Sequence, residues 1–386
     1  MNTVGVIGLG YVGLPLAVAF AEAGCEVVGV DVDARKVEAL RTGTSYIEDV
    51  PSETLAQLSE RIHPSTRYAP LAKVDAVLIC VPTPLTPNRE PDLGPLLDAV
   101  RALAEVLQSE QLVVLESTSY PGTTRERVAP LLEESGLAAG RDFHLAFSPE
   151  RVDPGRRDFT LRNTPKVIGG LTAACAQRAE DLYALVCDEL VRVSTPEAAE
   201  LTKLLENIFR SVNIALVNEL AMLTDRMGID VWEVIESAAT KPYGFMRFEP
   251  GPGMGGHCLP VDPFYLSWRA REFDLATEFI ELAGKVNQQM PYHCVAKVQQ
   301  ALNRSGLAVG TLLAVGHCYR RTTWAAPKER VTPRRSTSSR ERLATSSWST
   351  SGCAVTITTT SASLTARSSG LLLRAKSLSA GTCGSW

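Results

Sequence analysis

The sequence predicts an α/β protein in which a doubly wound parallel sheet is followed by a long connecting helix and an all-helical central domain. Three observations support this prediction. Short apolar runs alternate with helical patterns through residues 1–195, as in a parallel sheet with crossover helices. A glycine-rich turn at residues 8–13 joins the first strand to the first helix. From residue 196 the apolar spacing becomes helical and stays so.

Composition narrows the class of protein. The chain has 386 residues and a formal net charge of -4 at pH 7. A charge this small argues against nucleic acid or a membrane surface as the main partner. The 9 cysteines show no paired or metal-ligand spacing, which argues against a disulfide scaffold and a bound metal. No secretion signal opens the chain and no apolar run is long enough to span a membrane, so we expect a cytoplasmic protein.

The turn at residues 8–13 has the glycine spacing of a dinucleotide-binding site. It follows a predicted strand at residues 3–7 and opens a helix, as a Rossmann-type domain requires. Gly8 would allow the tight turn, and Gly10 would let a pyrophosphate reach backbone N–H groups at the helix N-terminus. Gly13 would allow close packing of helix on strand. The alternative is a glycine-rich turn that binds no ligand.

The second strand ends at Asp31, about twenty residues after the turn, where a dinucleotide site places an acidic residue. Its carboxylate would accept hydrogen bonds from the ribose hydroxyls and repel a 2′-phosphate, which favours NAD over NADP. The cations Arg35 and Lys36 nearby weaken that preference. The predicted cofactor contacts in this part of the chain are Gly8, Gly10, Tyr11, Val12, Gly13, Asp31 and Arg35.

Three further buried strands are predicted at residues 74–81, 111–116 and 144–147. Ligands of such sheets bind at the carboxyl ends of the strands, which places Thr83 and Thr118 where a ribose and a nicotinamide would lie. Capping of the next helix is the alternative role for both hydroxyls. The same sheet edge carries Glu150 and Arg151, for which an exposed ion pair is the alternative.

Residues 196–227 contain no glycine, and no proline after the first residue, and predict one long helix. Four polar residues at spacings of three or four would share one face of it, which is either solvated or part of a site. These residues are Glu200, Lys203, Asn207 and Arg210. Further helical patterns cover residues 230–240 and 262–304.

The loop between these last two patterns carries Cys258 among glycines, with Asp262 four residues later. Glycines let the backbone approach a ligand closely, so the thiol could serve as a nucleophile. A free cysteine buried in the core is the alternative.

Six motifs in order give the chain a family resemblance: GLGYVGLP, CVPTP, ESTSYPGTT, FSPERVDPG, ELTKLLENIFRSVNIALVNE and PGPGMGGHCLPVDPFYL. The chain resembles the UDP-glucose/GDP-mannose dehydrogenase family of nucleotide-sugar 6-dehydrogenases. The segment SPERVDPG, followed by PKVIGG, resembles the members that oxidise UDP-N-acetylhexosamines more than those that oxidise UDP-glucose. The chain departs from that subgroup at residues 247–249, where a proline and a second aromatic residue are expected.

The resemblance implies a four-electron, NAD-dependent oxidation of a sugar C6 hydroxyl to a uronate, a precursor of surface polysaccharide. It implies that the Cys258 thiolate adds to the intermediate aldehyde, and that the thiohemiacetal becomes a thioester that water cleaves. Lys203 and Asn207 would stabilise the developing negative charge at C6, and Asp262 would organise Lys203 and a water.

The resemblance gives the remaining site residues and the assembly as well. It implies that Glu150 and Thr118 position the water, and that the 196–227 helix forms the core of a homodimer. The implied contacts of the UDP-sugar are Glu150, Arg151, Lys203, Asn207, Arg210 and Gly255.

The end of the chain departs from the family. Members close with a UDP-binding, Rossmann-like domain, whose first strand begins here at residues 310–316 and then breaks off. Beyond Pro333 the sequence is rich in Ser, Thr and Arg, a composition typical of disorder. We predict a reading-frame change near residue 315, loss of most of that domain, and weak or absent turnover. The predicted domains are the NAD-binding domain, the helical central domain with the cysteine loop, and an aberrant remnant, at residues 1–195, 196–305 and 306–386.

Other functions stay open from sequence alone. One is a UDP-glucose 6-dehydrogenase. A second is a two-electron dehydrogenase of the 6-phosphogluconate or 3-hydroxyacid type, which needs no cysteine. A third is a non-catalytic remnant that binds NAD.

Overall fold

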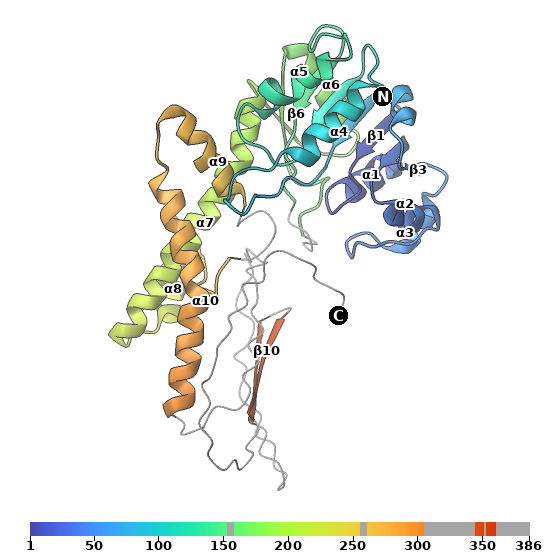
Figure 1. Cartoon of the computed structure of the whole chain (residues 1–386). Coiled ribbons are helices and arrows are strands. Elements are labelled where there is room, and N and C mark those ends of the chain that lie inside the picture. Colours follow the sequence, from blue (N-terminus) through green and yellow to red (C-terminus); the bar gives the residue numbers. More distant parts are fainter. Residues whose placement is uncertain (153–157, 255–260, 305–343, 351–352, 360–386) are drawn as a thin grey trace. The chain divides into compact units, whose positions relative to one another are not determined.

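The computed structural model describes residues 1–152, 158–254, 261–304, 344–350 and 353–359. The chain divides into two compact units, and residues 1–296 belong to the first. This unit holds an eight-stranded sheet in the order β3-β2-β1-β4-β5-β6-β7-β8 (Figure 1). The strands are β1 (Thr3–Ile7), β2 (Glu26–Val30), β3 (Ile62–Ser65), β4 (Ala76–Ile79), β5 (Leu112–Leu115), β6 (His144–Phe147), β7 (Lys166–Gly170) and β8 (Leu190–Val193).

The predicted doubly wound sheet is confirmed. Strands β1 to β6 run parallel, whereas β7 pairs antiparallel with β6, so that β7 and β8 run in the opposite direction. Strands β4 and β5 are buried along their whole length, as expected for strands covered on both faces. Strands β3, β7 and β8 were not predicted from the sequence.

Helices cover both faces of the sheet and bury its apolar side chains. One apolar core joins the sheet to α1 and α6, and a second joins it to α4 and α5. Short helices complete the first domain. The helices of this part are α1 (Gly13–Glu22), α2 (Ala34–Arg41), α3 (Ser52–Gln57), α4 (Gly94–Ala104), α5 (Ala129–Glu133) and α6 (Ala173–Tyr183), with short helical turns η1 (Ala69–Lys73) and η2 (Thr123–Val128).

The long helix α7 (Pro196–Met227) has the predicted bounds. The Thr195 side chain accepts a hydrogen bond from the Ala198 amide and caps its start, where Pro196 fits because its missing N–H needs no partner. Gly228, with φ 72°, ends it in the left-handed conformation. The sequence signals at both ends of this helix are therefore sufficient to place it.

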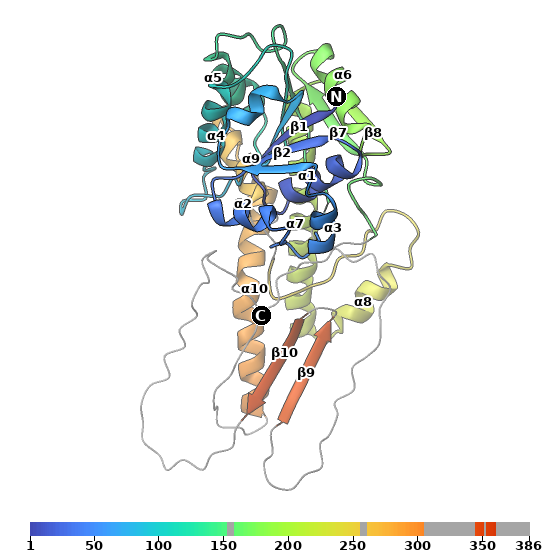
Figure 2. The same cartoon turned by 90° about the vertical axis from the view of Figure 1, so that its right-hand side faces the viewer.

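Three more helices follow, with a short turn η3 (Arg271–Phe273) between the last two: α8 (Val231–Ala238), α9 (Asp262–Ala270) and α10 (Glu278–Arg304). Helix α10 lies alongside α7 in both views (Figures 1 and 2). The amide of Asn287 on α10 accepts from Asn218 of α7 at 2.9 Å and donates to the Ser211 carbonyl at 3.1 Å. Within the described residues, no helix is both long and apolar enough to cross a membrane.

The second unit contains two described strands, β9 (Ala344–Thr350) and β10 (Cys353–Thr359), which pair antiparallel. The residues of these two strands include threonine, valine and isoleucine, which favour extended backbone. The prediction that residues 306–386 are an aberrant, disordered remnant of a domain stays a prediction. The predicted break near residue 315 lies outside the described residues.

Candidate active site

The glycine turn between β1 and α1 is tightly enclosed at its two ends and open in the middle. Gly8 has φ +90°, and a Cβ there would lie 2.7 Å from the Cys80 carbonyl oxygen. A Cβ at Gly13 would lie 1.9 Å from the Gly8 carbonyl oxygen. A Cβ at Gly10 would have no atom within 4 Å. The turn thus leaves free space at Gly10, beside the start of α1, where an anionic group could meet backbone N–H groups. Of the other two cofactor contacts predicted in this turn, Tyr11 is 55% exposed and Val12 directly precedes α1.

Asp31 follows β2 and is held by the turn itself. It is 6% exposed and accepts hydrogen bonds from the Leu9 amide at 2.9 Å and the Asp33 amide at 2.9 Å. Lys36 Nζ lies 3.0 Å from Asp31 Oδ2, the oxygen that also accepts from the Leu9 amide. Lys36 therefore contacts the predicted ribose-binding carboxylate, although only Arg35 was predicted as a cofactor contact.

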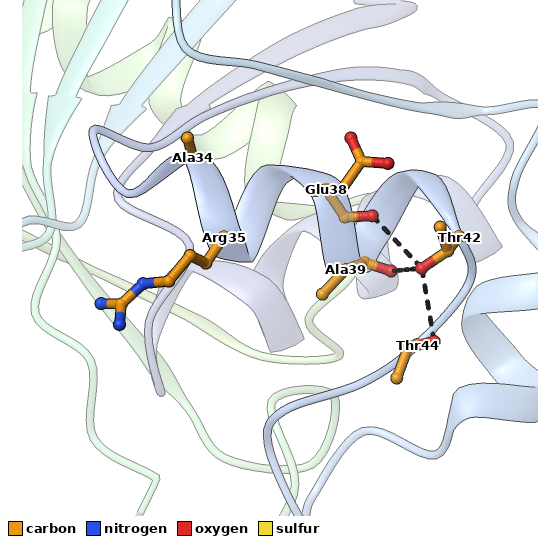
Figure 3. A pocket seen from close by; sticks show the side chains of 6 residues that line it. All are labelled: Ala34, Arg35, Glu38, Ala39, Thr42 and Thr44. Atoms are coloured by element: carbon orange, nitrogen blue, oxygen red, sulfur yellow. Dashed lines mark hydrogen bonds between the residues drawn. The ribbon is translucent and has the colours of Figure 1, made fainter.

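Arg35 is directed elsewhere. Its guanidinium, 90% exposed, pairs with Asp33 at 2.8 Å. The residue also borders a surface hollow on α2, shown in Figure 3, where its side chain extends away from the Thr42 end. There the Thr42 hydroxyl donates to the carbonyls of Glu38 and Ala39, at the end of the helix. These hydrogen bonds close the end of α2.

Thr83 and Thr118 follow β4 and β5 at the carboxyl edge of the sheet, and both are partly buried. The Ser117 hydroxyl donates to the Val81 carbonyl at 2.8 Å, which holds the two segments side by side. Neither threonine caps a helix, because Leu93 precedes α4 and Gly122 precedes η2. The capping alternative is therefore wrong for both.

The face of α7 that the sequence singled out is buried rather than solvated. Lys203 is 8% exposed and Asn207 4%, and both face α9, whose first residue is Asp262. The Asn207 amide donates to the Asp262 carboxylate, and the Arg210 guanidinium donates to the Asn207 side-chain oxygen. Burial raises the pKa of Asp262 to about 6, against the opposing effect of the Lys203 charge. The structure thus brings together an ammonium, an amide and a carboxyl in one enclosed cluster.

Glu200, one turn earlier on α7, anchors the loop that follows Thr118. Its carboxylate accepts from the Gly122 amide at 2.6 Å, and from the Thr124 amide at 2.9 Å and hydroxyl at 2.7 Å. The Ser119 hydroxyl adds a contact at 3.3 Å. Glu200 therefore links α7 to the loop after β5. None of these hydrogen bonds involves Lys203, Asn207 or Asp262.

Glu150 and Arg151 follow β6 but do not form the exposed ion pair that was the alternative for them. Glu150 Oε2 lies 3.3 Å from Lys166 Nζ, whose side chain is 3% exposed. Arg151 instead pairs with Glu206 of α7 at 2.6 Å and donates to the Pro165 carbonyl at 2.6 Å. Both residues therefore have partners from other elements.

Electrostatics link Glu150 to the α7 cluster. Burial works against ionisation of Glu150, but Lys166 first, and Lys203 as well, hold its pKa below its ordinary value. The positive charge of Lys203 therefore lowers the pKa of two carboxyl groups, that of Asp262 on α9 and that of Glu150 after β6. Among the described residues, no group of three or more His, Cys, Asp or Glu side chains is placed to hold a metal.

Cys258 and Gly255 lie outside the described residues, so their predicted roles stay predictions. Two partners that the fold supplies were not predicted from the sequence: Lys166 for Glu150 and Glu206 for Arg151. Lys36 was expected near Asp31, and the structure places its ammonium in contact with that carboxylate. One sequence signal could have pointed to Lys166: it directly precedes the apolar run VIGG. A lysine at the start of a buried strand needs a buried partner of opposite charge.

Comparisons with known proteins agree with the motifs. Residues 2–187 match the NAD binding domain of the UDP-glucose/GDP-mannose dehydrogenase family, and residues 197–289 match its central domain. The chain is 38% identical over 301 residues to a UDP-N-acetyl-D-glucosamine 6-dehydrogenase of Pseudomonas aeruginosa, covering 78% of this chain and 70% of that one. It is 39% identical over 311 residues to a UDP-N-acetyl-D-mannosamine dehydrogenase of Pyrococcus horikoshii, covering 79% and 72%.

A solved structure of a UDP-D-ManNAc dehydrogenase from Pyrococcus horikoshii matches with a TM-score of 0.74 and 37% identity, over 79% of this chain and 72% of that one. The resemblance inferred from the motifs is thereby confirmed, and so is NAD as the cofactor. The chain belongs to the UDP-glucose/GDP-mannose dehydrogenase family.

Proposed function

We propose that the chain oxidises the C6 hydroxyl of a UDP-sugar to a carboxylate in two NAD-dependent steps, with a UDP-N-acetylhexosamine as the favoured substrate. The observation that carries this proposal is the buried cluster of Lys203, Asn207 and Asp262 where α7 meets α9. Relatives named as UDP-N-acetylhexosamine dehydrogenases support the choice of substrate. Oxidation of an alcohol builds negative charge on oxygen, and a buried ammonium with an oriented amide donor stabilises such charge strongly.

The first domain fits NAD. The free space at Gly10 suits a pyrophosphate, and Asp31, fixed by the Leu9 and Asp33 amides, suits a ribose diol. Thr83 and Thr118, at the ends of neighbouring strands, would border the nicotinamide. NAD, when bound there, takes up the hydride that leaves the sugar carbon.

We assign the remaining chemistry to side chains of this chain. Lys203 and Asn207 would stabilise the C6 alkoxide, and Cys258 would add its thiolate to the aldehyde, forming a carbon–sulfur bond and preventing release. Loss of the second hydride from that carbon gives a thioester. Glu150 would orient the water that attacks it, which releases the uronate and returns the thiol. The uronate is suited to surface polysaccharide synthesis.

We also propose a homodimer formed through α7. Its apolar residues Leu205, Leu216 and Leu223 are 61%, 55% and 52% exposed. They lie at helical spacing on one side of the helix, together with Leu201, Leu220 and Met227. Light scattering at micromolar concentration should give a dimer, and Leu205→Glu with Leu216→Glu should give a monomer. The exposed Glu38→Lys on α2 is the control, and a wild-type monomer would contradict the proposal.

The activity is tested by the ratio of NADH to uronate, measured with enzyme at substrate concentration so that slow turnover is still detected. We expect two NADH per uronate with UDP-N-acetylglucosamine or UDP-N-acetylmannosamine, and less product with UDP-glucose. Cys258→Ser should abolish uronate, whereas Cys294→Ser, a partly exposed cysteine of α10, should not. One NADH per product would favour the two-electron dehydrogenase, and NAD binding without product would favour the non-catalytic remnant.

A further inference from the structure

We propose that Lys166 is a positioning residue, which fixes the Glu150 carboxylate in one orientation and in its charged form at the edge of the site. The value of this arrangement for catalysis rests on the proposed function, in which Glu150 orients water. The interaction itself can be tested in the protein without substrate.

Lys166 lies where two strand ends meet. It is the first residue of β7, which pairs antiparallel with β6, so its side chain reaches the edge where β5 and β6 end. Its Nζ lies 2.8 Å from Glu116 Oε2 and 3.3 Å from Glu150 Oε2. Glu116 directly follows β5 and has a side chain that is 0% exposed. The ammonium therefore bridges a wholly buried carboxylate and one that borders the site.

Both oxygens of Glu150 are held. Oε1 accepts from the Arg151 amide at 2.9 Å and from the Val152 amide at 2.6 Å, while Oε2 faces Lys166. A carboxylate with donors on both oxygens has little freedom to rotate. Such a group can hold a water in one place, which a flexible exposed glutamate would not do.

Glu116 in turn fixes Lys166. The Tyr183 hydroxyl of α6 donates to Glu116 Oε1, and the Tyr183 ring lies 5.0 Å from the Lys166 ammonium. The four side chains form a chain from the core to the site, with Tyr183 as the innermost member and Glu150 as the outermost. A buried ammonium next to two carboxylates leaves one negative charge in excess, and this charge can be carried by Glu150.

The charges are arranged to keep Glu150 ionised. Although burial opposes its charge, the neighbouring carboxylates raise the pKa of Lys166, and Glu116 contributes more than Glu150. Burial raises the pKa of Glu116, so that any additional proton would go to Glu116. Burial also acts against Glu150, but Lys166 lowers its pKa. The titratable groups that interact electrostatically with Glu150 are Lys166, Lys203, Glu116, Cys80 and Cys187.

The decisive variant removes the ammonium together with its buried counter-charge. In Lys166→Met with Glu116→Gln the wholly buried ion pair is replaced by two neutral side chains, and Glu150 keeps only the charge of Lys203 nearby, so the fold should survive. Glu150 then stays largely buried without its cation, and its pKa should rise above the ordinary value of 4.5. A triple variant carries Glu150→Gln in addition to these two substitutions. It differs from the double variant only in lacking the Glu150 carboxyl group, which titrates.

Unfolding of this pair is measured by denaturant titration from pH 4 to pH 8. A group with a raised folded-state pKa stabilises below its unfolded value, and that stability is lost as pH rises. The folded-to-unfolded ratio of the double variant, relative to the triple variant, should therefore fall up to about tenfold per pH unit between 4.5 and the new pKa. A purely structural Lys166 would give parallel pH profiles for the two variants, and that result would overturn the proposal.

A second comparison covers the case in which the double variant does not fold. Wild type and Glu150→Gln are compared over a range extended on the acidic side, to about pH 2.5. With Lys166 in place the folded-state pKa of Glu150 is depressed, so wild type should lose stability relative to Glu150→Gln as pH falls below 4.5 and through the folded-state pKa. The opposite slope would contradict the proposal. Neither comparison uses substrate, so failure of the proposed activity would leave these outcomes unchanged.

Discussion

Two substitutions in the glycine turn should separate an effect on stability from an effect on cofactor binding. Gly13→Ala should mainly lower stability, and Gly10→Ala should mainly weaken NAD binding. At Gly13 the new Cβ would lie 1.9 Å from the Gly8 carbonyl oxygen and 3.2 Å from Cys80 Cβ. The helix and the turn must move apart by about 1 Å or more to relieve that contact. At Gly10 the new methyl would have no atom within 4 Å, and the backbone there is not in the left-handed region.

The magnitudes follow from this geometry. Overpacking at Gly13 should cost about 1–3 kcal/mol of unfolding free energy, partly offset by up to about 1 kcal/mol because alanine is the better helix former. Gly10→Ala should change the unfolding free energy by less than about 0.5 kcal/mol. The same methyl would occupy the space proposed for the pyrophosphate, so NAD affinity should fall by at least about tenfold, or about 1.4 kcal/mol.

Urea denaturation gives the stabilities, and fluorescence titration with NADH gives the affinities. We expect Gly13→Ala to be less stable than wild type, and Gly10→Ala to be as stable as wild type but defective in binding. Unchanged NADH affinity in Gly10→Ala would refute the placement of the cofactor at this turn. Equal losses of stability in both variants would refute the geometric argument.

Two further predictions concern buried polar groups. Thr124→Val removes the hydroxyl 2.7 Å from Glu200 and should lower the unfolding free energy by about 1–3 kcal/mol, whereas exposed Thr42→Val should change it by less than about 0.5 kcal/mol. Equal effects in denaturant titrations would refute this. Asp262, with its pKa raised from 3.8 to about 6, stabilises most at acidic pH, and that contribution is lost as pH rises through 6. Relative to Asp262→Asn, wild type should lose about 2–3 kcal/mol of unfolding free energy between pH 4 and pH 7, and a flat difference would contradict it.

Local sequence patterns sufficed for several elements. The bounds of α7 follow from Thr195 and Pro196 at its start and Gly228 at its end, because capping depends on neighbouring residues only. The glycine turn and the position of Asp31 are likewise local, since both lie within one strand–helix–strand unit. Helical spacing also grouped Lys203 and Asn207 on one face, although it could not tell a buried face from a solvated one.

Partnerships between distant residues needed the tertiary structure. Lys166 meets Glu116 across 50 positions of sequence because β7 turns back beside β6, and no periodicity in the sequence reports that reversal. A local ion pair with Glu150 was the alternative role for Arg151, yet α7 supplies Glu206 as its partner. The sequence by itself thus determined the family, the cofactor and the type of the elements with strong local patterns, because these depend on neighbouring residues. The order and direction of the strands decided which charges are buried together, because only packing brings remote side chains within range of a hydrogen bond.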